Sequence, residues 1–274
     1  MIVTALVQGI TEFLPISSQA HLIMLPRLTG WCDQGPMIDI AVHVGTLGAV
    51  VVYLWPECFG MARGVLNLAR GRRSNEARLF MFLVLATIPV VVAGWLVKTY
   101  VGLELRSLKV IAWATLGFAV LLWVADRWGL KIRRVDHMTW QSALFIGVFQ
   151  AIALIPGTSR SGITMTAARL LGFERIAAAR FSMLMAIPVI VAAGTLAGLD
   201  LVKAGNAQLT QAVFLSAALA FVAAFVAIIA MMGWLKRANF TPFVIYRIVL
   251  GVVLLTLVYA YGVQDSSLTA ACPA

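Results

Sequence analysis

The sequence predicts an all-α integral membrane protein, a polytopic helical bundle with two re-entrant hairpins and an inverted-topology repeat. Two observations predict the membrane location: 62% of the 274 residues are hydrophobic and only 12% are charged. This is about half the charged fraction of a soluble domain, too little to cover a water-facing surface. A third observation predicts the hairpins, because two of the apolar regions are interrupted near their centres by polar residues, proline and glycine.

Six uninterrupted apolar stretches are long enough to cross the hydrocarbon core, which takes about 20 residues of helix. Each stretch is bounded by charge, glycine or proline, and we expect each to form one spanning helix. They cover approximately residues 38–55, 79–97, 108–125, 178–199, 212–235 and 243–262. The whole chain, 1–274, is then expected to form a single membrane domain.

Two further apolar regions are too broken to be simple spans. The first, 1–30, is interrupted from Glu12 to Ser18, and the second, 141–172, is interrupted around Pro156. The pieces on either side of each break are too short to cross the membrane alone. Irregular backbone is tolerated at membrane depth where protein buries it, so we expect two re-entrant hairpins.

Three spans follow each hairpin, and this order predicts the repeat. Because three is odd, the two halves enter the membrane from opposite faces, and we expect inverted repeats at approximately 1–126 and 138–262. A short sequence echo supports them, since the surroundings of Gly9 resemble those of Gly147. A second match, of residues 86–90 with 185–189, joins non-equivalent spans, so either apolar composition produced it or the repeats interleave.

Arginine and lysine concentrate in the segments 56–78, 126–137 and 236–237, while the intervening loops have few. If the spans alternate in direction, these segments share one side, which the positive-inside rule assigns to the cytoplasm. The net charge of +10 is therefore explained by topology, and nucleic acid is not an expected partner.

Four polar residues lie at membrane depth within or just after the first break: Glu12, Ser17, Ser18 and His21. An ionisable residue in the membrane costs about 2.5–3.5 kcal/mol even on a lenient scale, so we expect such a set to be functional. Gln8 precedes Glu12 by one helical turn and shares its helical face. Either serine could instead cap the helix that restarts after the break.

The second break predicts an anion site. Gly157 frees the backbone, and Arg160 is the one permanent positive charge of the segment. Backbone N–H groups at the start of a helix bind anions, and the planar guanidinium of arginine fits phosphate. The alternative is that Arg160 only neutralises Glu12, a costly way to join two hairpins. The expected phosphate-binding residues are Ser17, Gly157, Ser159, Arg160, Ser161 and Thr164.

These residue types suit phosphoryl transfer, in which charge spreads over the phosphate oxygens. Glu12 could accept a proton or bind a divalent cation, since Mg²⁺ is often held by one or two carboxylates and the substrate phosphates. Ser18 and His21 are rival nucleophiles, and water is a third possibility. We expect Glu12, Ser18, His21 and Arg160 to be catalytic.

Secondary candidates are Gln8, Asp39 and His43. Asp39 and His43 are four residues apart at the start of a span, where they could line the mouth of the site or pair with each other. Arg247 lies near the start of the last span, and we predict that its side chain extends toward the lipid headgroups.

Two long motifs resemble the undecaprenyl-diphosphatase (BacA/UppP) family of bacterial envelopes. The first reads QGITEFLPISSQAH from Gln8 to His21, and the second reads PGTSRSGIT from Pro156 to Thr164. The second motif matches the family pattern PGxSRSxxT in full, and the resemblance extends over nearly the whole chain. The family admits Glu or Gln at the first position of its ExxxE element, so Gln8 is compatible with activity but removes one of two carboxylates.

The resemblance implies hydrolysis of undecaprenyl diphosphate to undecaprenyl phosphate and inorganic phosphate. This recycles the lipid carrier for peptidoglycan synthesis and cell wall biogenesis, and it confers bacitracin resistance. It further implies a divalent cation (Mg²⁺ or Ca²⁺) and a place in the bacterial cytoplasmic (inner) membrane, with the active site toward the periplasm.

The expected partners are the polyprenyl diphosphate lipid substrate and membrane lipid, with a homodimer left open. The rival function is a polyprenyl-phosphate lipid transporter or flippase, because inverted repeats with broken helices are typical of transporters.

Overall fold

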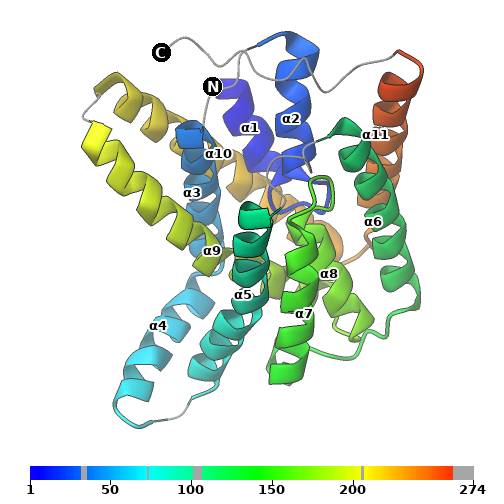
Figure 1. The fold of residues 1–274 in the computed structure, drawn as a ribbon. Helices are drawn as coiled ribbons and strands as arrows, with labels where there is room; N and C mark the ends of the chain where they lie inside the picture. Colours follow the sequence, from blue (N-terminus) through cyan, green and yellow to red (C-terminus); the bar gives the residue numbers. More distant parts are fainter. Residues whose placement is uncertain (32–35, 73, 101–106, 205–206, 262–274) are drawn as a thin grey trace.

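The computed structural model describes residues 1–31, 36–72, 74–100, 107–204 and 207–261, and the regular elements within these ranges are helical (Figure 1). In chain order they are α1 (Ile2–Thr11), α2 (Ser18–Thr29), α3 (Pro36–Tyr53), α4 (Trp55–Ala69), α5 (Asn75–Tyr100), α6 (Leu108–Trp128), the short 3₁₀ helix η2 (Val135–His137), α7 (Trp140–Ile152), α8 (Arg160–Leu170), α9 (Arg175–Ala204), α10 (Ala207–Leu235) and α11 (Thr241–Tyr259).

Within the described ranges, the helices α5, α6, α9, α10 and α11 are long and apolar enough to cross a membrane. These five become six if α3 and α4 together form one bent span. The six predicted spans correspond to α3 and these five helices. The prediction of a polytopic helical membrane protein is therefore confirmed.

The segment 56–78 was expected to be a basic loop, and this prediction is wrong in part because most of α4 lies within it. The chain turns by 88° between α3 and α4. Pro56 lies in the first turn of α4, where its missing N–H removes no hydrogen bond from the new helix. The same ring prevents α3 from continuing, because it would clash with the preceding turn.

Each broken apolar region forms a pair of short helices, α1 with α2 and α7 with α8. Figure 1 shows α1 and α2 reaching the middle of the bundle from one end and α7 and α8 from the other. Helices α1 and α7 have 10 and 13 residues, well short of a membrane span. Both predicted hairpins are therefore present, and they meet at the centre.

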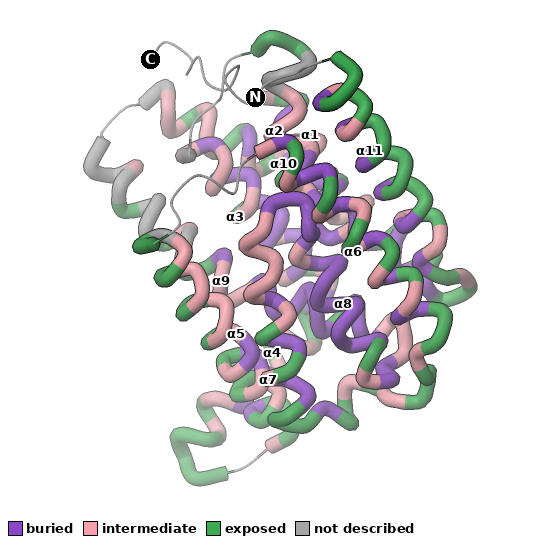
Figure 2. Tube along the Cα trace, turned by 45° about the vertical axis from the view of Figure 1, so that its right-hand side comes forward, coloured by how far each residue is buried: buried purple, intermediate pink, exposed green. Residues whose placement is uncertain are grey.

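Helix α8 lies inside the bundle, and Figure 2 shows it buried along most of its length. It packs against α6, α7 and α9. Its threonines satisfy their hydroxyls locally: Thr164 donates to the Arg160 carbonyl at 2.9 Å and Thr166 to the Gly162 carbonyl at 2.7 Å. A polar helix can occupy the interior because its buried donors have partners.

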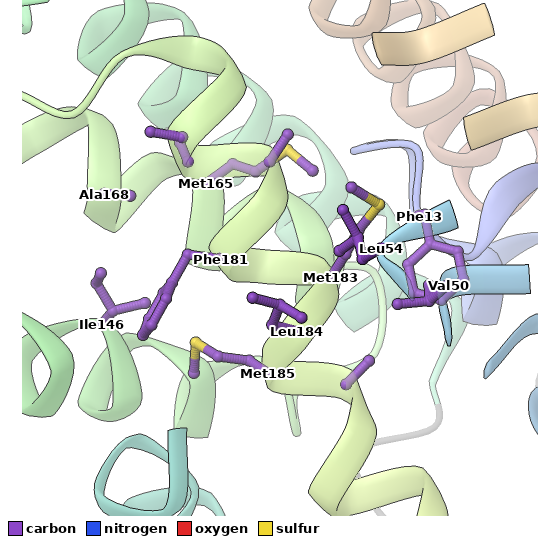
Figure 3. Packing of buried hydrophobic residues seen from close by; sticks show 14 of the residues in the cluster. Phe13, Val50, Leu54, Ile146, Met165, Ala168, Phe181, Met183, Leu184 and Met185 are labelled. Atoms are coloured by element: carbon purple, nitrogen blue, oxygen red, sulfur yellow. The ribbon is translucent and has the colours of Figure 1, made fainter. Parts of the chain in front are cut away.

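The apolar core connects α9 to the first hairpin. Phe181, Met183 and Leu184 of α9 are buried, and Figure 3 shows them packed in this core. Phe13, which follows Glu12, lies beside Val50 in the same view. The burial of Phe13 holds the turn that presents Glu12.

The two hairpins pack against different halves of the chain. A Cβ added to Gly9 of α1 would lie 2.7 Å from the Ala220 carbonyl oxygen of α10, and one added to Gly147 of α7 would lie 2.4 Å from the Ala86 carbonyl oxygen of α5. Each hairpin thus contacts the penultimate spanning helix of the other half. The inverted repeat stays a prediction, and interleaved repeats would give this packing.

A buried ionic cluster that the sequence did not predict joins several helices. The Asp126 carboxylate of α6 accepts hydrogen bonds from Arg169 Nε at 3.1 Å, from Arg175 Nε at 2.7 Å and from the Phe240 N–H at 3.2 Å. Arg169 also donates to backbone carbonyls, including that of Leu130 at 2.8 Å. A network whose charges all have partners stabilises one arrangement of helices, so we regard it as structural.

Candidate active site

Glu12 follows α1 directly and lies at the centre of the site. Its side chain is 6% exposed, and its Oε2 accepts hydrogen bonds from the Gln8 amide nitrogen at 2.7 Å and from the Ser18 hydroxyl at 2.8 Å. Gln8 lies one turn earlier in α1, whereas Ser18 begins α2. The break in the first hairpin therefore brings Ser18 back to the carboxylate.

Arg160, the first residue of α8, joins the second hairpin to this carboxylate. Its Nη2 donates to Glu12 Oε1 at 2.8 Å, and its guanidinium lies over the Phe13 ring, 5.8 Å from the centroid. The ion pair between Arg160 and Glu12, which was the alternative to an anion site, is thus present. This ion pair uses only some of the hydrogen-bond donors of the guanidinium. Its Nη1 has no hydrogen-bond partner among the described residues and can still donate to a phosphate oxygen.

Each break places a serine with positive φ immediately before its second helix. The φ angles are 73° at Ser17 and 69° at Ser159, the non-glycine residues with positive φ in the described chain. Such backbone costs about 1–3 kcal/mol and clusters at functional sites. Ser159 also caps α8, since its Oγ accepts from the Gly162 N–H at 3.1 Å.

Besides that of Ser159, two more of the predicted phosphate-binding hydroxyls are engaged within the protein. The Ser161 hydroxyl donates to the Leu14 carbonyl at 2.9 Å, and Thr164 Oγ1 lies 2.7 Å from the Ser182 hydroxyl of α9. Ser161 thus ties the two hairpins together. For both residues a direct contact with phosphate stays a prediction.

Ser17 and Gly157 differ from these two. The Ser17 hydroxyl is buried without a hydrogen-bond partner in the described structure, so it does not cap α2. A buried hydroxyl without a partner is a candidate contact for a phosphate oxygen. Gly157 has φ +94°, and a Cβ there would lie 2.4 Å from the Ile111 carbonyl oxygen, so this turn requires glycine.

His21 has partners other than Glu12. Its Nδ1 lies 2.8 Å from the Ser17 carbonyl oxygen and its Nε2 lies 2.5 Å from the Tyr246 hydroxyl. A carbonyl only accepts, so Nδ1 carries the hydrogen and Nε2 of the neutral ring accepts from Tyr246. Both nitrogens are then occupied, and this geometry does not favour His21 as the nucleophile.

His43, a secondary candidate, lies closer to the carboxylate. Its Nε2 is 3.7 Å from Glu12 Oε2, and its Nδ1 is 2.6 Å from the backbone carbonyl oxygen of Asp39. The carbonyl fixes the ring so that Nε2 is directed at the site. The structure therefore brings Glu12, Ser18, Arg160 and His43 together, with Asp39 supporting His43 through its backbone.

Two residues of α11 also reach the hairpins. The predicted extension of Arg247 toward the headgroups is wrong, because its side chain is 0% exposed and its Nη2 donates to the carbonyls of Gly157 and Thr158 at 3.0 and 2.9 Å. Its neighbour Tyr246 contacts His21. The available signal was an arginine inside an apolar span, which indicates a functional site by default.

The site combines one carboxylate, an arginine at a helix N-terminus, hydroxyls and an imidazole. Among the residues that the structure describes, no three His, Cys, Asp or Glu side chains form a metal-binding group. The arginine and the start of α8 can bind an oxyanion, while Glu12 can accept a proton beside it. This arrangement suits phosphoryl transfer.

Known proteins resemble the chain over most of its length. The family model described as "Bacitracin resistance protein BacA" matches residues 1–253. The chain is 49% identical over 266 residues to "Undecaprenyl-diphosphatase 1" of Rhodospirillum rubrum, covering 94% of each protein. It is 50% identical over 263 residues to "Undecaprenyl-diphosphatase" of Ruegeria pomeroyi, covering 95% of this chain and 98% of that protein.

Proposed function

The chain belongs to the bacitracin resistance protein BacA family, and we propose that it is an undecaprenyl-diphosphatase. It hydrolyses undecaprenyl diphosphate to undecaprenyl phosphate and inorganic phosphate, the activity that its relatives' names state. The reaction recycles the lipid carrier of cell wall synthesis and confers bacitracin resistance. One observation carries this proposal: the Glu12 carboxylate binds both Ser18 of one hairpin and Arg160 of the other.

Substrate binding follows from the second hairpin. Arg160 Nη1 and the N–H groups at the start of α8 donate to the terminal phosphate, where charge develops in the transition state. The Ser17 hydroxyl, buried without a partner in the described structure, adds a further donor. The lipid tail stays in the membrane, so the phosphates reach the hairpin tips from the bilayer surface.

Ser18 is the nucleophile that the geometry favours, because its hydroxyl already donates to Glu12 at 2.8 Å. Its oxygen attacks the terminal phosphorus, the proton passes to Glu12, and undecaprenyl phosphate leaves. Water then cleaves the phosphoserine and releases inorganic phosphate. Direct attack by a water held on Glu12 is the alternative route.

The activity is tested by measuring phosphate release from undecaprenyl diphosphate by the purified protein. We expect release by the wild type and at least about 100-fold slower release by Glu12→Gln and Arg160→Ala, because each change removes a group that acts on the reacting phosphate. Binding of the lipid without release by the wild type would contradict the hydrolase function.

A divalent cation, Mg²⁺ or Ca²⁺, is the cofactor that we propose. Gln8 Oε1 is buried without a hydrogen-bond partner among the described atoms, and the same side chain binds Glu12. One carboxylate and one amide oxygen fit a cation whose other ligands are substrate phosphates and water. Such a cation would neutralise phosphate charge when bound.

Gln8 offers a test of this cofactor. We expect Gln8→Glu to retain phosphate release and to shift its dependence on Mg²⁺ and Ca²⁺ concentration, because a second carboxylate strengthens the ligand set. Titration of each cation into chelator-treated protein measures the shift. Indifference to both cations in both forms would remove Glu12 and Gln8 from a metal-binding role.

We place the protein in the bacterial cytoplasmic membrane with the site toward the periplasm. The basic connections between α4 and α5 and between α6 and α7 lie at one end of the molecule (Figure 1), which supports a cytoplasmic assignment of that end. The first hairpin starts from the opposite end. A homodimer stays a prediction without separate support.

Lipid transport is a second candidate, favoured by one observation. A cavity of about 500 Å³ lies between α4, α5 and α9, away from Glu12, and the ion pairs Glu57–Arg180 and Arg134–Glu174 line it. Access from both ends is what a transporter requires. Movement of labelled lipid across vesicles by the hydrolysis-deficient Glu12→Gln variant would support transport, and absence of movement would contradict it.

A further inference from the structure

Arg247 of α11 is a buried cation for which the described chain supplies no counter-ion. Its side chain is 0% exposed, and its Nε and Nη1 have no hydrogen-bond partner in the described structure. Arg169 is equally buried, but its charge meets the carboxylate of Asp126 at 3.1 Å. Among the described residues, one buried arginine is thus neutralised by a carboxylate and the other is not.

This arrangement has a cost, because a buried charge is unfavourable unless it is paired. If Arg247 only held the backbone carbonyls of Gly157 and Thr158, an uncharged hydrogen-bond donor would be sufficient. The charge of Arg247 therefore points to a partner outside the described part of the chain.

The position of Arg247 indicates that this partner is the phosphate-bearing substrate. Its Nη2 holds the carbonyls of Gly157 and Thr158, and its Nη1 would lie 2.8 Å from a Cβ added to Gly162. The guanidinium therefore packs against the first turn of α8, behind the residues proposed to bind phosphate. By drawing two carbonyl oxygens toward itself, it keeps them from facing an incoming anion.

We propose that Arg247 is a positioning residue of the phosphate site and that its charge, unneutralised by the described chain, makes the site select a diphosphate over a monophosphate. This inference rests on the proposed function. Arg160 pairs with the carboxylate of Glu12 at 2.8 Å, whereas Arg247 has no carboxylate partner among the described residues, which leaves its positive charge in excess behind the phosphate site. A diphosphate carries more negative charge than a monophosphate and gains more from that excess.

The selection has a consequence for turnover. Once the terminal phosphate has been transferred, the lipid monophosphate is held by fewer charge interactions than the substrate was. Arg247 therefore strengthens binding of the substrate more than binding of the lipid product, and this difference favours product release.

Inorganic pyrophosphate and inorganic phosphate are suitable probes, because their binding is measured without turnover. Thermal unfolding of the full-length protein in detergent, repeated over a range of anion concentrations, gives the apparent affinity of the folded state. The variants are Arg247→Gln, which removes the charge, and Arg247→Lys, which keeps it. Thr115→Val is the matched control, because Thr115 donates to the same Gly157 carbonyl at 3.3 Å without carrying charge.

We expect Arg247→Gln to bind pyrophosphate about 10- to 100-fold more weakly than the wild type, the loss typical of removing an interaction with a charged group. The loss of phosphate affinity is smaller. Arg247→Lys retains most of the pyrophosphate affinity, and Thr115→Val matches the wild type.

Unchanged pyrophosphate affinity in folded Arg247→Gln, or equal losses for both anions, would overturn the inference. Failure of both Arg247 variants to fold while Thr115→Val folds would assign the residue to the fold alone and would also overturn it. Failure of the proposed function would be seen differently, as a wild type that binds pyrophosphate but releases no phosphate from undecaprenyl diphosphate.

Discussion

At the level of single residues, the chemistry depends on how the oxygens of Glu12 are shared. One oxygen meets Arg160 and the other meets Gln8 and Ser18, with His43 at 3.7 Å. Glu12 therefore receives hydrogen bonds from both hairpins, and α3 places His43 beside it. A carboxylate held in this way can take the Ser18 proton without moving, which lowers the reorganisation that the reaction requires.

Substitution of the two neighbouring serines separates their roles. We expect Ser18→Ala to lower kcat at least about 100-fold, because the attacking oxygen is lost. Ser17→Ala is expected to raise KM with a smaller change in kcat, because only a donor to the phosphate is lost. Steady-state phosphate release measures both effects.

A trap for the covalent intermediate completes this test. Acid quenching with substrate labelled in the terminal phosphate is expected to leave label on Ser18. Direct transfer of oxygen from labelled water, with no labelled serine, would replace Ser18 by water as the nucleophile.

At the level of helices, close backbone contacts set the depth of the hairpins. Gly147 lets α7 approach α5, as Gly9 lets α1 approach α10. The serines at the two breaks, Ser17 and Ser159, share the same unusual φ. The corresponding contacts hold each hairpin close to a spanning helix of the other half, while the inverted repeat stays a prediction.

Alanine at Gly147 tests these contacts. We expect Gly147→Ala to destabilise the protein by about 1–3 kcal/mol, because the new methyl group overlaps the backbone of Ala86. Gly233→Ala is the matched control, since a Cβ there has nothing within 4 Å and alanine favours helix. Unfolding in detergent measures both, and equal stability of the two variants would contradict the close approach.

At the level of the whole molecule, the two hairpins reach the centre from opposite ends. The path that we propose for the substrate begins at the end from which the first hairpin starts. Orientation in the membrane therefore decides which leaflet supplies the diphosphate. The basic connections at the other end agree with a periplasmic path.

Thiol labelling of intact cells tests this orientation. In a chain whose native cysteines are replaced by serine, we expect Trp31→Cys to react with a membrane-impermeant maleimide before lysis. Arg237→Cys is expected to react only after lysis, because it lies at the basic end. The reverse pattern would place the site toward the cytoplasm.

Hydropathy alone predicted the spans and both breaks, because the preference of an apolar segment for lipid is local and additive along the chain. It did not predict α4, because the segment that was expected to be a loop forms a new helix after the bend before Pro56. It also predicted the wrong surroundings for Arg247, since the same local pattern describes an arginine at a span end and one buried behind a loop.

Composition and residue order were enough to identify a membrane protein and to single out Glu12, Ser18 and Arg160 as functional candidates, because polar groups at membrane depth are costly wherever they pack. The partners of these residues became known from the folded arrangement of the helices. Glu12 and Arg160 are 148 positions apart, and His43, Tyr246 and Arg247 reach the hairpins from α3 and α11. Such contacts depend on how distant helices pack, which local composition does not specify.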